Sequence, residues 1–404
     1  MTPDRAALLA GIAADPDNDL RRLVFADWLD DHGEPARAEF IRLQIEGPRV
    51  TDPAEWKSLD ARVRELFRDH AADWFAPFLR ALDPERHFPT AYAFNPGGGR
   101  TCAIACRHDS PSLPAYIPVV AVRRGFVELL TLNLAALPAG SSVGAALAHE
   151  PMSKVSALLT GDSRQWTRFS EPGLRHITDL TLEEATNGTP LVAASAAFTD
   201  SHLPAVRTFR LRTRNRDAQP RRLPAVPVAT VQAFAESPLA YRVTNLSLEL
   251  DDAGLRILCR SDWLQLDKLT VTGAITRAGV LTLNAARFAP TLRALELSAR
   301  VGDEGVAALA RATRFAKLVE LDLSGNDITD AGLRALASAR FVPQLEVLDL
   351  SENQIQLTAD APGLRALADA LNPDALRKLR VGYAGYVTAP TYLTARFGDR
   401  VTVH

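Results

Sequence analysis

The stretches LVELDLSGNDI, from Leu318 to Ile328, and LEVLDLSENQI, from Leu345 to Ile355, are near-copies of one another. Both fit the pattern L-x-x-L-x-L-x-x-N-x-I. Alternate side chains of an extended chain point to one face, so the pattern predicts a short strand that buries leucines and then bends at the Asn. One such unit cannot bury its leucines alone, and we therefore expect a stack of parallel strands.

The strand pattern recurs along most of the chain. Its first positions lie 23 to 27 residues apart between Val243 and Leu345. The interval widens to 37 residues between Val206 and Val243, where the Pro-rich residues 220–227 mark an insertion or a broken repeat. We expect ten strands, with the frames Val127/Leu130/Leu132, Val155/Leu158/Thr160, Ile177/Leu180/Leu182, Val206/Phe209/Leu211, Val243/Leu246/Leu248, Leu266/Leu269/Val271, Leu292/Leu295/Leu297, Leu318/Leu321/Leu323, Leu345/Leu348/Leu350 and Leu376/Leu379/Val381.

The segments between these strands predict helices. GDEGVAALARAT follows Val301 and TDAGLRALASA follows Ile328. Each has an Asp and then apolar residues at helical spacing, so we expect Asp303 and Asp330 to cap helix N-termini. Strands and helices that alternate at this interval resemble the ribonuclease-inhibitor type of leucine-rich repeat. The resemblance implies an α/β leucine-rich-repeat solenoid, a horseshoe with parallel strands inside and helices outside.

The first 82 residues show helical spacing and lack the strand pattern. The helix in DLRRLVFADWLDDHG has an apolar face of the kind that packs on a core, formed by Leu20, Leu23, Val24 and Trp28. A later helix carries Trp56, Leu59, Val63, Leu66 and Phe67 on one face. We expect a small helical domain at residues 1–82, a loop-rich junction at 83–123 with a strand at Cys102 to Cys106, and a repeat array at 124–404. A last helix that ends near Gly398 and a short strand would cap the array.

Three segments resemble the bacterial repeat-companion domain, a module that occurs beside leucine-rich and other repeats. They are LVFADWLDDHGEPARAEFIRLQ, which starts at Leu23, then Asp73-Trp74, and Arg124-Gly125-Phe126-Val127. The resemblance implies a bacterial protein with a helical module in front of its repeats. It brings no catalytic residues with it.

The composition limits the kinds of partner. Of 404 residues 47% are hydrophobic, and 46 basic against 48 acidic residues give a net charge of -2. This balance argues against a general affinity for nucleic acid or acidic membranes. Three cysteines are too few for a disulfide framework, and no apolar stretch is long enough to span a bilayer. We therefore expect a cytoplasmic protein.

Two groups of residues could carry chemistry. Carboxylates and an imidazole gather at Asp27, Asp30, Asp31, His32 and Glu34, and thiols and an imidazole at Cys102, Cys106 and His108. We favour structural roles for both. The first group is interpreted as a charged helix surface on which Asp27 pairs with Arg37 or Arg42, and the second lacks a fourth zinc ligand. Without a nucleophile motif or a phosphate-binding loop, the sequence predicts no enzyme activity, no cofactor and no metal.

The strand positions that alternate with the buried leucines form the expected binding surface, on the concave side of a horseshoe. Its centre is acidic and its flanks are basic, a pattern that would select a protein with complementary charges. The expected partner-binding residues are Glu296, Glu320, Asp322 and Asp349 in the centre, with Arg210, Arg212, Lys378 and Arg380 on the flanks. The alternative is that these charges only keep the solenoid soluble. Asn326 and Asn353 are expected to form bends rather than to bind.

A non-enzymatic scaffold for protein-protein interaction is therefore the expected function, with the helical domain as a second candidate docking site. The seven arginines between Arg207 and Arg222 suggest an alternative, RNA or phosphate binding, because Arg pairs with phosphate and stacks on bases. A solvated loop is the simpler interpretation, since Phe209 alone interrupts the cluster with an aromatic ring. Regulation of a GTPase is a further alternative, by analogy with ribonuclease-inhibitor-like solenoids.

Overall fold

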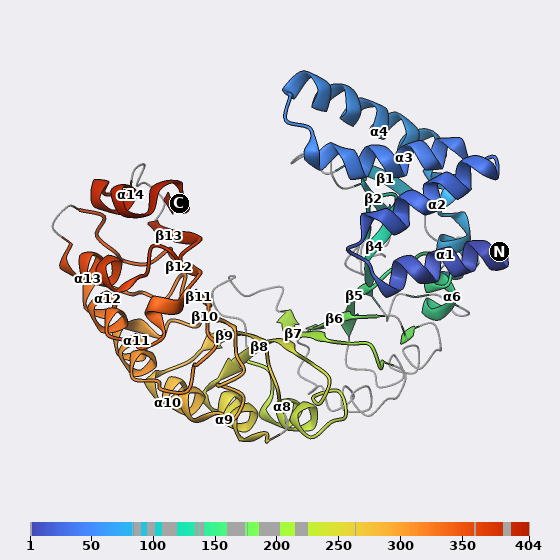
Figure 1. The fold of residues 1–404 in the computed structure, drawn as a ribbon. Coiled ribbons are helices and arrows are strands. Elements are labelled where there is room, and N and C mark those ends of the chain that lie inside the picture. The colour runs from blue at the N-terminus through green and yellow to red at the C-terminus, as the bar shows by residue number, and fades with distance from the viewer. Residues whose placement is uncertain are drawn as a thin grey trace. The chain divides into compact units, whose positions relative to one another are not determined.

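The chain folds into two compact units, each of which is described by itself (Figure 1). The structure, a computed structural model, describes residues 2–82, 84, 90–94, 102–106, 119–133, 137, 141–159, 174–175, 177–185, 203–214, 225–262, 264–358, 361–382 and 389–403. Unit 1 comprises Met1–Asn187 and Asp200–Val206, and unit 2 comprises Gly188–Thr199 and Arg207–His404.

Unit 1 begins with helices whose starts are set by short polar side chains and by proline. Asn18 caps the second helix by accepting a hydrogen bond from Leu20 N at 3.1 Å, and Asp52 caps the fourth by accepting one from Ala54 N at 2.9 Å. Pro35 begins the third helix, where its missing N–H costs nothing. The described helices of this unit are α1 (Pro3–Ala14), α2 (Asp19–Asp31), α3 (Pro35–Glu46), η1 (Gly47–Arg49), α4 (Pro53–Trp74), α5 (Ala76–Leu82) and α6 (Val143–Leu147).

Helix α2 buries a face that only partly overlaps the one that the sequence predicts. Its buried residues are Arg22, Phe25, Ala26 and Leu29, and the three apolar ones pack against Ile12, Ile41 and Phe126. Leu20 and Val24 are instead 67% and 47% exposed. The prediction for α2 is therefore confirmed for Leu23 and Trp28, which are partly buried and pack against this core, and wrong for Leu20 and Val24. The core centres on the stripe that contains Phe25 and Leu29 because three neighbouring elements converge on it.

The sheet of unit 1 changes from antiparallel to parallel pairing at its fourth strand. Its strands are β1 (Thr90–Phe94), β2 (Cys102–Cys106), β3 (Val119–Arg123), β4 (Phe126–Asn133), β5 (Lys154–Leu159) and β6 (Asp179–Ala185). Strands β1 to β4 pair antiparallel, and β4, β5 and β6 pair parallel. The strand predicted at Cys102 to Cys106 is confirmed as β2.

One strand frame in unit 1 is displaced from its predicted position. Val155 pairs with Leu130 on one side and Leu180 on the other, so it takes the second leucine position and not the first. The frame therefore begins at Met152, which is buried, and ends at Ala157. The prediction that started this frame at Val155 is wrong by three residues, because Met and Ala occupy positions where the pattern expects leucine.

Unit 2 is a parallel array in which helices connect successive strands (Figure 1). Its strands are β7 (Thr208–Arg214), β8 (Asn245–Asp251), β9 (Lys268–Ala274), β10 (Ala294–Ser298), β11 (Glu320–Asp322), β12 (Val347–Ser351), β13 (Lys378–Gly382) and β14 (Val401–Val403). The described helices are α8 (Val228–Ala235), α9 (Asp252–Arg260), α10 (Arg277–Ala285), α11 (Gly302–Ala310), α12 (Asp330–Ala337), η5 (Val342–Gln344), α13 (Pro362–Ala370), α14 (Thr391–Phe397) and η6 (Gly398–Arg400). Leu321 and Leu348 pair in register and are buried, which confirms the predicted α/β solenoid.

Asn326 and Asn353 are buried and bond to the repeat that precedes them. The Oδ1 atom of Asn326 accepts hydrogen bonds from Ala299 N at 3.1 Å and Val301 N at 3.2 Å. The Oδ1 atom of Asn353 accepts from Asn326 N at 2.9 Å and Ile328 N at 3.0 Å. Their amide nitrogens donate to strand-end carbonyls. Because these bonds satisfy backbone groups that would otherwise be buried and unpaired, the predicted bend role is confirmed.

The starts of the helices in unit 2 differ from the prediction. Thr329, rather than Asp330, is the N-cap of α12, and Asp303 lies inside α11, whose N-cap Val301 makes no side-chain hydrogen bond. The Asp303 carboxylate instead accepts hydrogen bonds from the next repeat: from Thr329 N at 2.8 Å, Thr329 Oγ1 at 2.6 Å and Gly332 N at 3.0 Å. The predicted capping roles of Asp303 and Asp330 are therefore wrong, because both carboxylates accept hydrogen bonds from the start of the next helix, Asp330 from Gly363 N.

The array ends as predicted, with a helix and a short strand. Helix α14 ends at Gly398, which has a positive φ of 64°, and β14 pairs with β13. Phe397 is fully buried at this end. Among the helices that the structure describes, none combines the length and apolar character needed to cross a lipid bilayer.

Candidate binding surface on the strand face

The side chains of β7 to β13 that alternate with the buried leucines form one surface of unit 2, which we call the strand face. Side chains at paired positions of parallel strands stand beside one another, about 4.8 Å apart. One row consists of Arg210, Ser247, Thr270, Glu296, Asp322, Asp349 and Arg380. A second row, two residues earlier in each strand, consists of Lys268, Ala294, Glu320, Val347 and Lys378. The structure thus brings six of the eight predicted binding residues together on neighbouring strands, β10 to β13.

Asp349 and Arg380 form an ion pair in the first row. Arg380 Nη1 lies 2.8 Å from Asp349 Oδ2, and the Asp349 side chain is only 7% exposed. Burial acts to raise the pKa of Asp349, but hydrogen bonds from Arg380 and from the Ser351 hydroxyl and amide outweigh it and hold the pKa below its usual range. Asp349 is therefore a buried anion that orients Arg380, rather than an open contact point. The sequence alone could have predicted this ion pair, because aligning the frames of β12 and β13 places Asp349 and Arg380 side by side.

Glu296 also has partners of its own on the strand face. Its Oε2 atom accepts a hydrogen bond from Thr270 Oγ1 at 3.0 Å and lies 3.8 Å from Lys268 Nζ. Sequence reasoning missed Lys268 and Thr270, although both fall at outward positions of the frame that precedes Glu296. These contacts reduce the charge that Glu296 can offer to another molecule.

The open acidic part of the strand face lies on β11. Glu320 is exposed, and Asp322 is half-buried and accepts a hydrogen bond from Ser324 N at 2.9 Å. Neither carboxylate forms an ion pair with any residue that the structure describes. Two uncompensated negative charges therefore stand on one short strand.

The basic flank at β7 is described only in part. Arg210 is half-buried and Arg212 is exposed on this strand. Three strands separate them from β11. Arg207, just before this strand, is exposed as well. The side chain of Arg214 and all of Arg216, Arg221 and Arg222 lie outside the described residues.

The other candidate groups have structural surroundings. Arg42 Nη2 lies 2.6 Å from Asp27 Oδ1 and 2.7 Å from Asp30 Oδ2, as expected for a charged helix surface. Burial raises the pKa of the Cys102 and Cys259 thiols to about 12, so both are protonated and poor nucleophiles at neutral pH. Within the described residues, no group of three His, Cys, Asp or Glu side chains could hold a metal ion. The Cys106 side chain, His108 and the glycines at 97–99 lie outside them.

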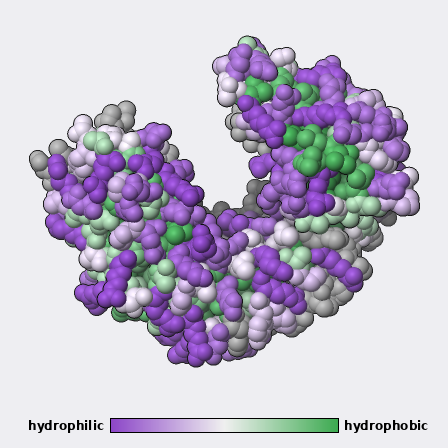
Figure 2. All heavy atoms as spheres, in the orientation of Figure 1, coloured by the Kyte–Doolittle hydropathy of each residue, from purple (hydrophilic) through white to green (hydrophobic). Residues whose placement is uncertain are grey.

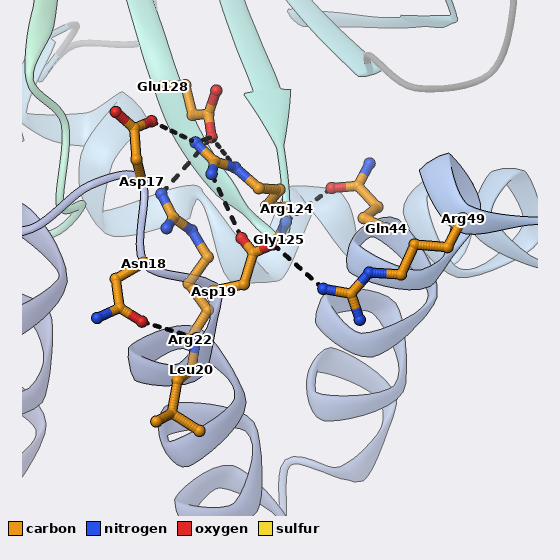
Figure 3. A network of polar contacts seen from close by, with 10 residues as sticks. All are labelled: Asp17, Asn18, Asp19, Leu20, Arg22, Gln44, Arg49, Arg124, Gly125 and Glu128. Atoms are coloured by element: carbon orange, nitrogen blue, oxygen red, sulfur yellow. Dashed lines mark hydrogen bonds and ion pairs between the residues drawn. The ribbon is translucent and has the colours of Figure 1, made fainter.

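Two of the segments with the repeat-companion resemblance meet in unit 1 (Figure 3). Gly125 N donates a hydrogen bond to Gln44 Oε1 at 2.7 Å, so the turn between β3 and β4 is fixed to helix α3. The Arg124 side chain lies 2.6 Å from Glu128 on β4 and 3.3 Å from Asp19, the first residue of α2. The matching segments therefore form the contact between the helices and the first parallel strands.

A hydrophobic area is also exposed on unit 1. Figure 2 shows it where Figure 1 draws α2 and α3. Leu20 and Val24, one helical turn apart on α2, are among the exposed large hydrophobic residues of the unit. Exposed apolar patches often mark sites of protein contact, so this area is the candidate docking site of the helical domain.

A family model of a single repeat matches one segment of unit 2. Residues 316–337 match the family described as Leucine Rich repeat, and this stretch contains β11, Asn326 and α12. The chain therefore contains leucine-rich repeats. No curated protein matches it. Among solved structures, it is similar to one titled "Crystal structure of Rad7 and Elc1 complex in yeast", with 11% identity and a TM-score of 0.32 over 63% of this chain and 74% of that chain.

Proposed function

We propose that the protein is a non-enzymatic interaction scaffold that binds a partner protein on the strand face of unit 2. The observation that carries the proposal is the pair of uncompensated carboxylates on β11, Glu320 and Asp322, between strands whose charges are already paired. Charged groups that are held in register on a rigid sheet give orientation and specificity to protein association. Glu296, Asp349, Arg210, Arg212, Lys378 and Arg380 would complete the contact surface.

We also propose the type of the N-terminal module and the cellular location of the protein. Residues 1–82 would be a module of the repeat-companion type, which is supported by the contact between Gln44 and the Arg124-Gly125 turn. A bacterial cytoplasm is supported by this resemblance and by the presence of only three cysteines. A GTPase is one class of protein partner that such a surface could hold.

Affinity capture from a lysate of the protein's own cells, treated with nuclease, tests the proposal. The charge-reversal variant Glu320→Lys/Asp322→Lys is compared with the wild type and with Glu304→Lys/Asp374→Lys, which changes two exposed carboxylates elsewhere in unit 2 by the same charge. We expect a protein that the wild type and the control both capture and that the β11 variant loses. Equal capture by all three would contradict a role for β11.

RNA or phosphate binding is tested by the same experiment without nuclease. Arg212 is an exposed arginine of the cluster on β7, and its neighbour Arg210 shares the strand face. Capture of nucleic acid that weakens steeply with salt and is lost in Arg210→Ala/Arg212→Ala would favour this alternative. Capture that is indifferent to these changes would remove it.

A further inference from the structure

The neighbouring strands β11, β12 and β13 carry a patch with two charged ends and an apolar centre. Glu320 and Asp322 stand on β11, and Lys378 and Arg380 stand on β13. Val347, half-buried, lies between Glu320 and Lys378 in the second row. We call these five residues the dipolar patch.

The ion pair between β12 and β13 holds Arg380 in place at the basic end of the dipolar patch. Asp349 stands between Asp322 and Arg380 in the first row, but it is buried and bound to Arg380. The Arg380 side chain remains 35% exposed while this bond fixes its position. An arginine that is already oriented loses less conformational freedom when it binds a carboxylate. Asp349 balances the charge of Arg380, but Lys378 on the same strand forms no ion pair with any residue that the structure describes. The β13 end therefore favours an acidic group and the β11 end a basic one.

The spacing of the dipolar patch fits one face of a helix. Two strand separations of about 4.8 Å place the acidic and basic ends about 10 Å apart. On a helix, residues i and i+7 are about 10.5 Å apart along the axis, with i+3 and i+4 between them on the same face. On an extended strand, three successive side chains of one face span about 13 Å. The helix is the better match for a basic, an apolar and an acidic group in a row.

We infer that the dipolar patch binds a helix of the partner protein that presents Lys or Arg at one position, an apolar side chain one turn on, and Asp or Glu two turns on. The inference rests on the proposed function and specifies the partner's contact. The basic group of this helix lies on Glu320 and Asp322, its apolar side chain on Val347, and its acidic group on Lys378 and Arg380.

A synthetic helical peptide tests the inference without knowledge of the partner. The probe is an alanine-based peptide of about 18 residues, long enough for marginal helicity, with Arg at i, Leu at i+3 and i+4, and Glu at i+7. In the matched control peptide the Glu is moved to i+9, on the opposite side of the helix. Binding to the full chain is followed by fluorescence anisotropy and by the methyl NMR signals of Val347. We expect tighter binding of the probe and movement of the Val347 signals.

Variants of the dipolar patch with reversed charge, each paired with a peptide of reversed charge, test whether the binding depends on these contacts. Exposed ion pairs change affinity about two- to five-fold each, so Glu320→Lys/Asp322→Lys is expected to weaken the probe roughly ten-fold. The same variant should bind more tightly a second peptide in which Glu replaces the Arg. At the other end of the patch, Lys378→Glu should favour a peptide in which Arg replaces the Glu. An unfolded variant would not show this gain, and the methyl spectrum reports folding directly.

The outcomes separate this inference from the proposed function. Equal binding of probe and control peptide, unmoved Val347 signals, or no exchange of preference in the charge-swapped variants would overturn the helix-binding inference. If capture from the lysate still depends on Glu320 and Asp322, the proposed function stands without it. If that capture shows no such dependence, the proposed function fails at its own test.

Discussion

At the scale of single residues, Gly125 shows why the turn between β3 and β4 tolerates so little change. Its φ is +84°, and a Cβ atom there would overlap the side chain of Ile41 on α3. Gly33 has nearly the same φ, +81°, but a Cβ atom there would meet nothing within 4 Å. A substitution at Gly33 would therefore cause backbone strain alone, whereas one at Gly125 would cause backbone strain and a steric overlap with Ile41.

We predict that Gly125→Ala destabilises the protein more than Gly33→Ala. A left-handed conformation costs a non-glycine residue about 1–2 kcal/mol, which both variants share. The overlap with Ile41 adds roughly 1–3 kcal/mol in Gly125→Ala alone. Chemical denaturation followed by tryptophan fluorescence measures both losses, and equal losses would show that the turn does not pack tightly on α3.

Asp349 makes the stability of unit 2 depend on pH. The pKa of its carboxyl group is lower in the folded chain than its ordinary value of about 3.9. The contribution of Asp349 is therefore fully present above that ordinary value and is lost as the pH falls through the folded pKa.

We predict that Asp349→Asn lowers the free energy of unfolding by about 1.5–3 kcal/mol at neutral pH, because Arg380 loses a charged acceptor. The difference from the wild type should shrink below about pH 4, where the Asp349 carboxyl group of the unfolded chain becomes protonated before that of the folded chain. Urea denaturation at several pH values measures it, with the exposed Asp374→Asn as control. A difference that stays constant down to pH 3 would contradict the ion pair.

At the scale of elements, aspartates at the starts of α9, α11 and α12 bond to the start of the following helix. Asp252 accepts hydrogen bonds from Thr276 N at 2.9 Å and Thr276 Oγ1 at 2.5 Å, one repeat further on. Asp303 does the same for Thr329, and Arg277 takes the corresponding position in α10. The following helix, α11, is also the one whose N-cap has no side-chain hydrogen bond. The starts of α10 and α12 therefore depend on an aspartate of the previous repeat.

Asp303→Ala is expected to lower the free energy of unfolding by about 1–3 kcal/mol, because it leaves donors at the start of α12 without their acceptor. Glu304→Ala removes a carboxylate from the same helical turn and should have a smaller effect, since Glu304 is exposed. Thermal or urea denaturation of the two variants provides the comparison. A loss that is as large in Glu304→Ala would mean that the helix dipole, and not the bond to Thr329, matters.

The sequence predicts strands better than contacts between repeats. Nine of the ten frames have the predicted register, because regularly spaced leucines and valines mark the buried face directly. The frame at Val155 was displaced because Met152 and Ala157 are weak markers. The roles of Asp303 and Asp349 were missed because their partners are a whole repeat away. Both partners could be found by writing the repeats above one another.

At the scale of the whole molecule, the array should respond to a core change beyond the altered strand. Leu348 pairs with Leu321 on β11 and Leu379 on β13, and all three are buried. Since each repeat is stabilised through its neighbours, loss of one buried side chain weakens the repeats on both sides.

We predict that Leu348→Ala costs about 2–5 kcal/mol and that hydrogen exchange speeds up in β11, β12 and β13 together. Hydrogen exchange measured by mass spectrometry resolves the individual strands. The exposed Gln354→Ala is the control, and its exchange should remain close to that of the wild type. Faster exchange confined to β12 would show that the repeats are independent.

The buried asparagines have a further consequence for how the chain is made. Asn326 completes the bend of the repeat before it, and Asn353 completes the bend that contains Asn326. A ribosome releases the N-terminal repeat of each pair first, before the asparagine that will satisfy its backbone exists. Folding of these repeats during synthesis must therefore trail translation by at least one repeat length, and a pause in translation between them would leave the earlier bend open.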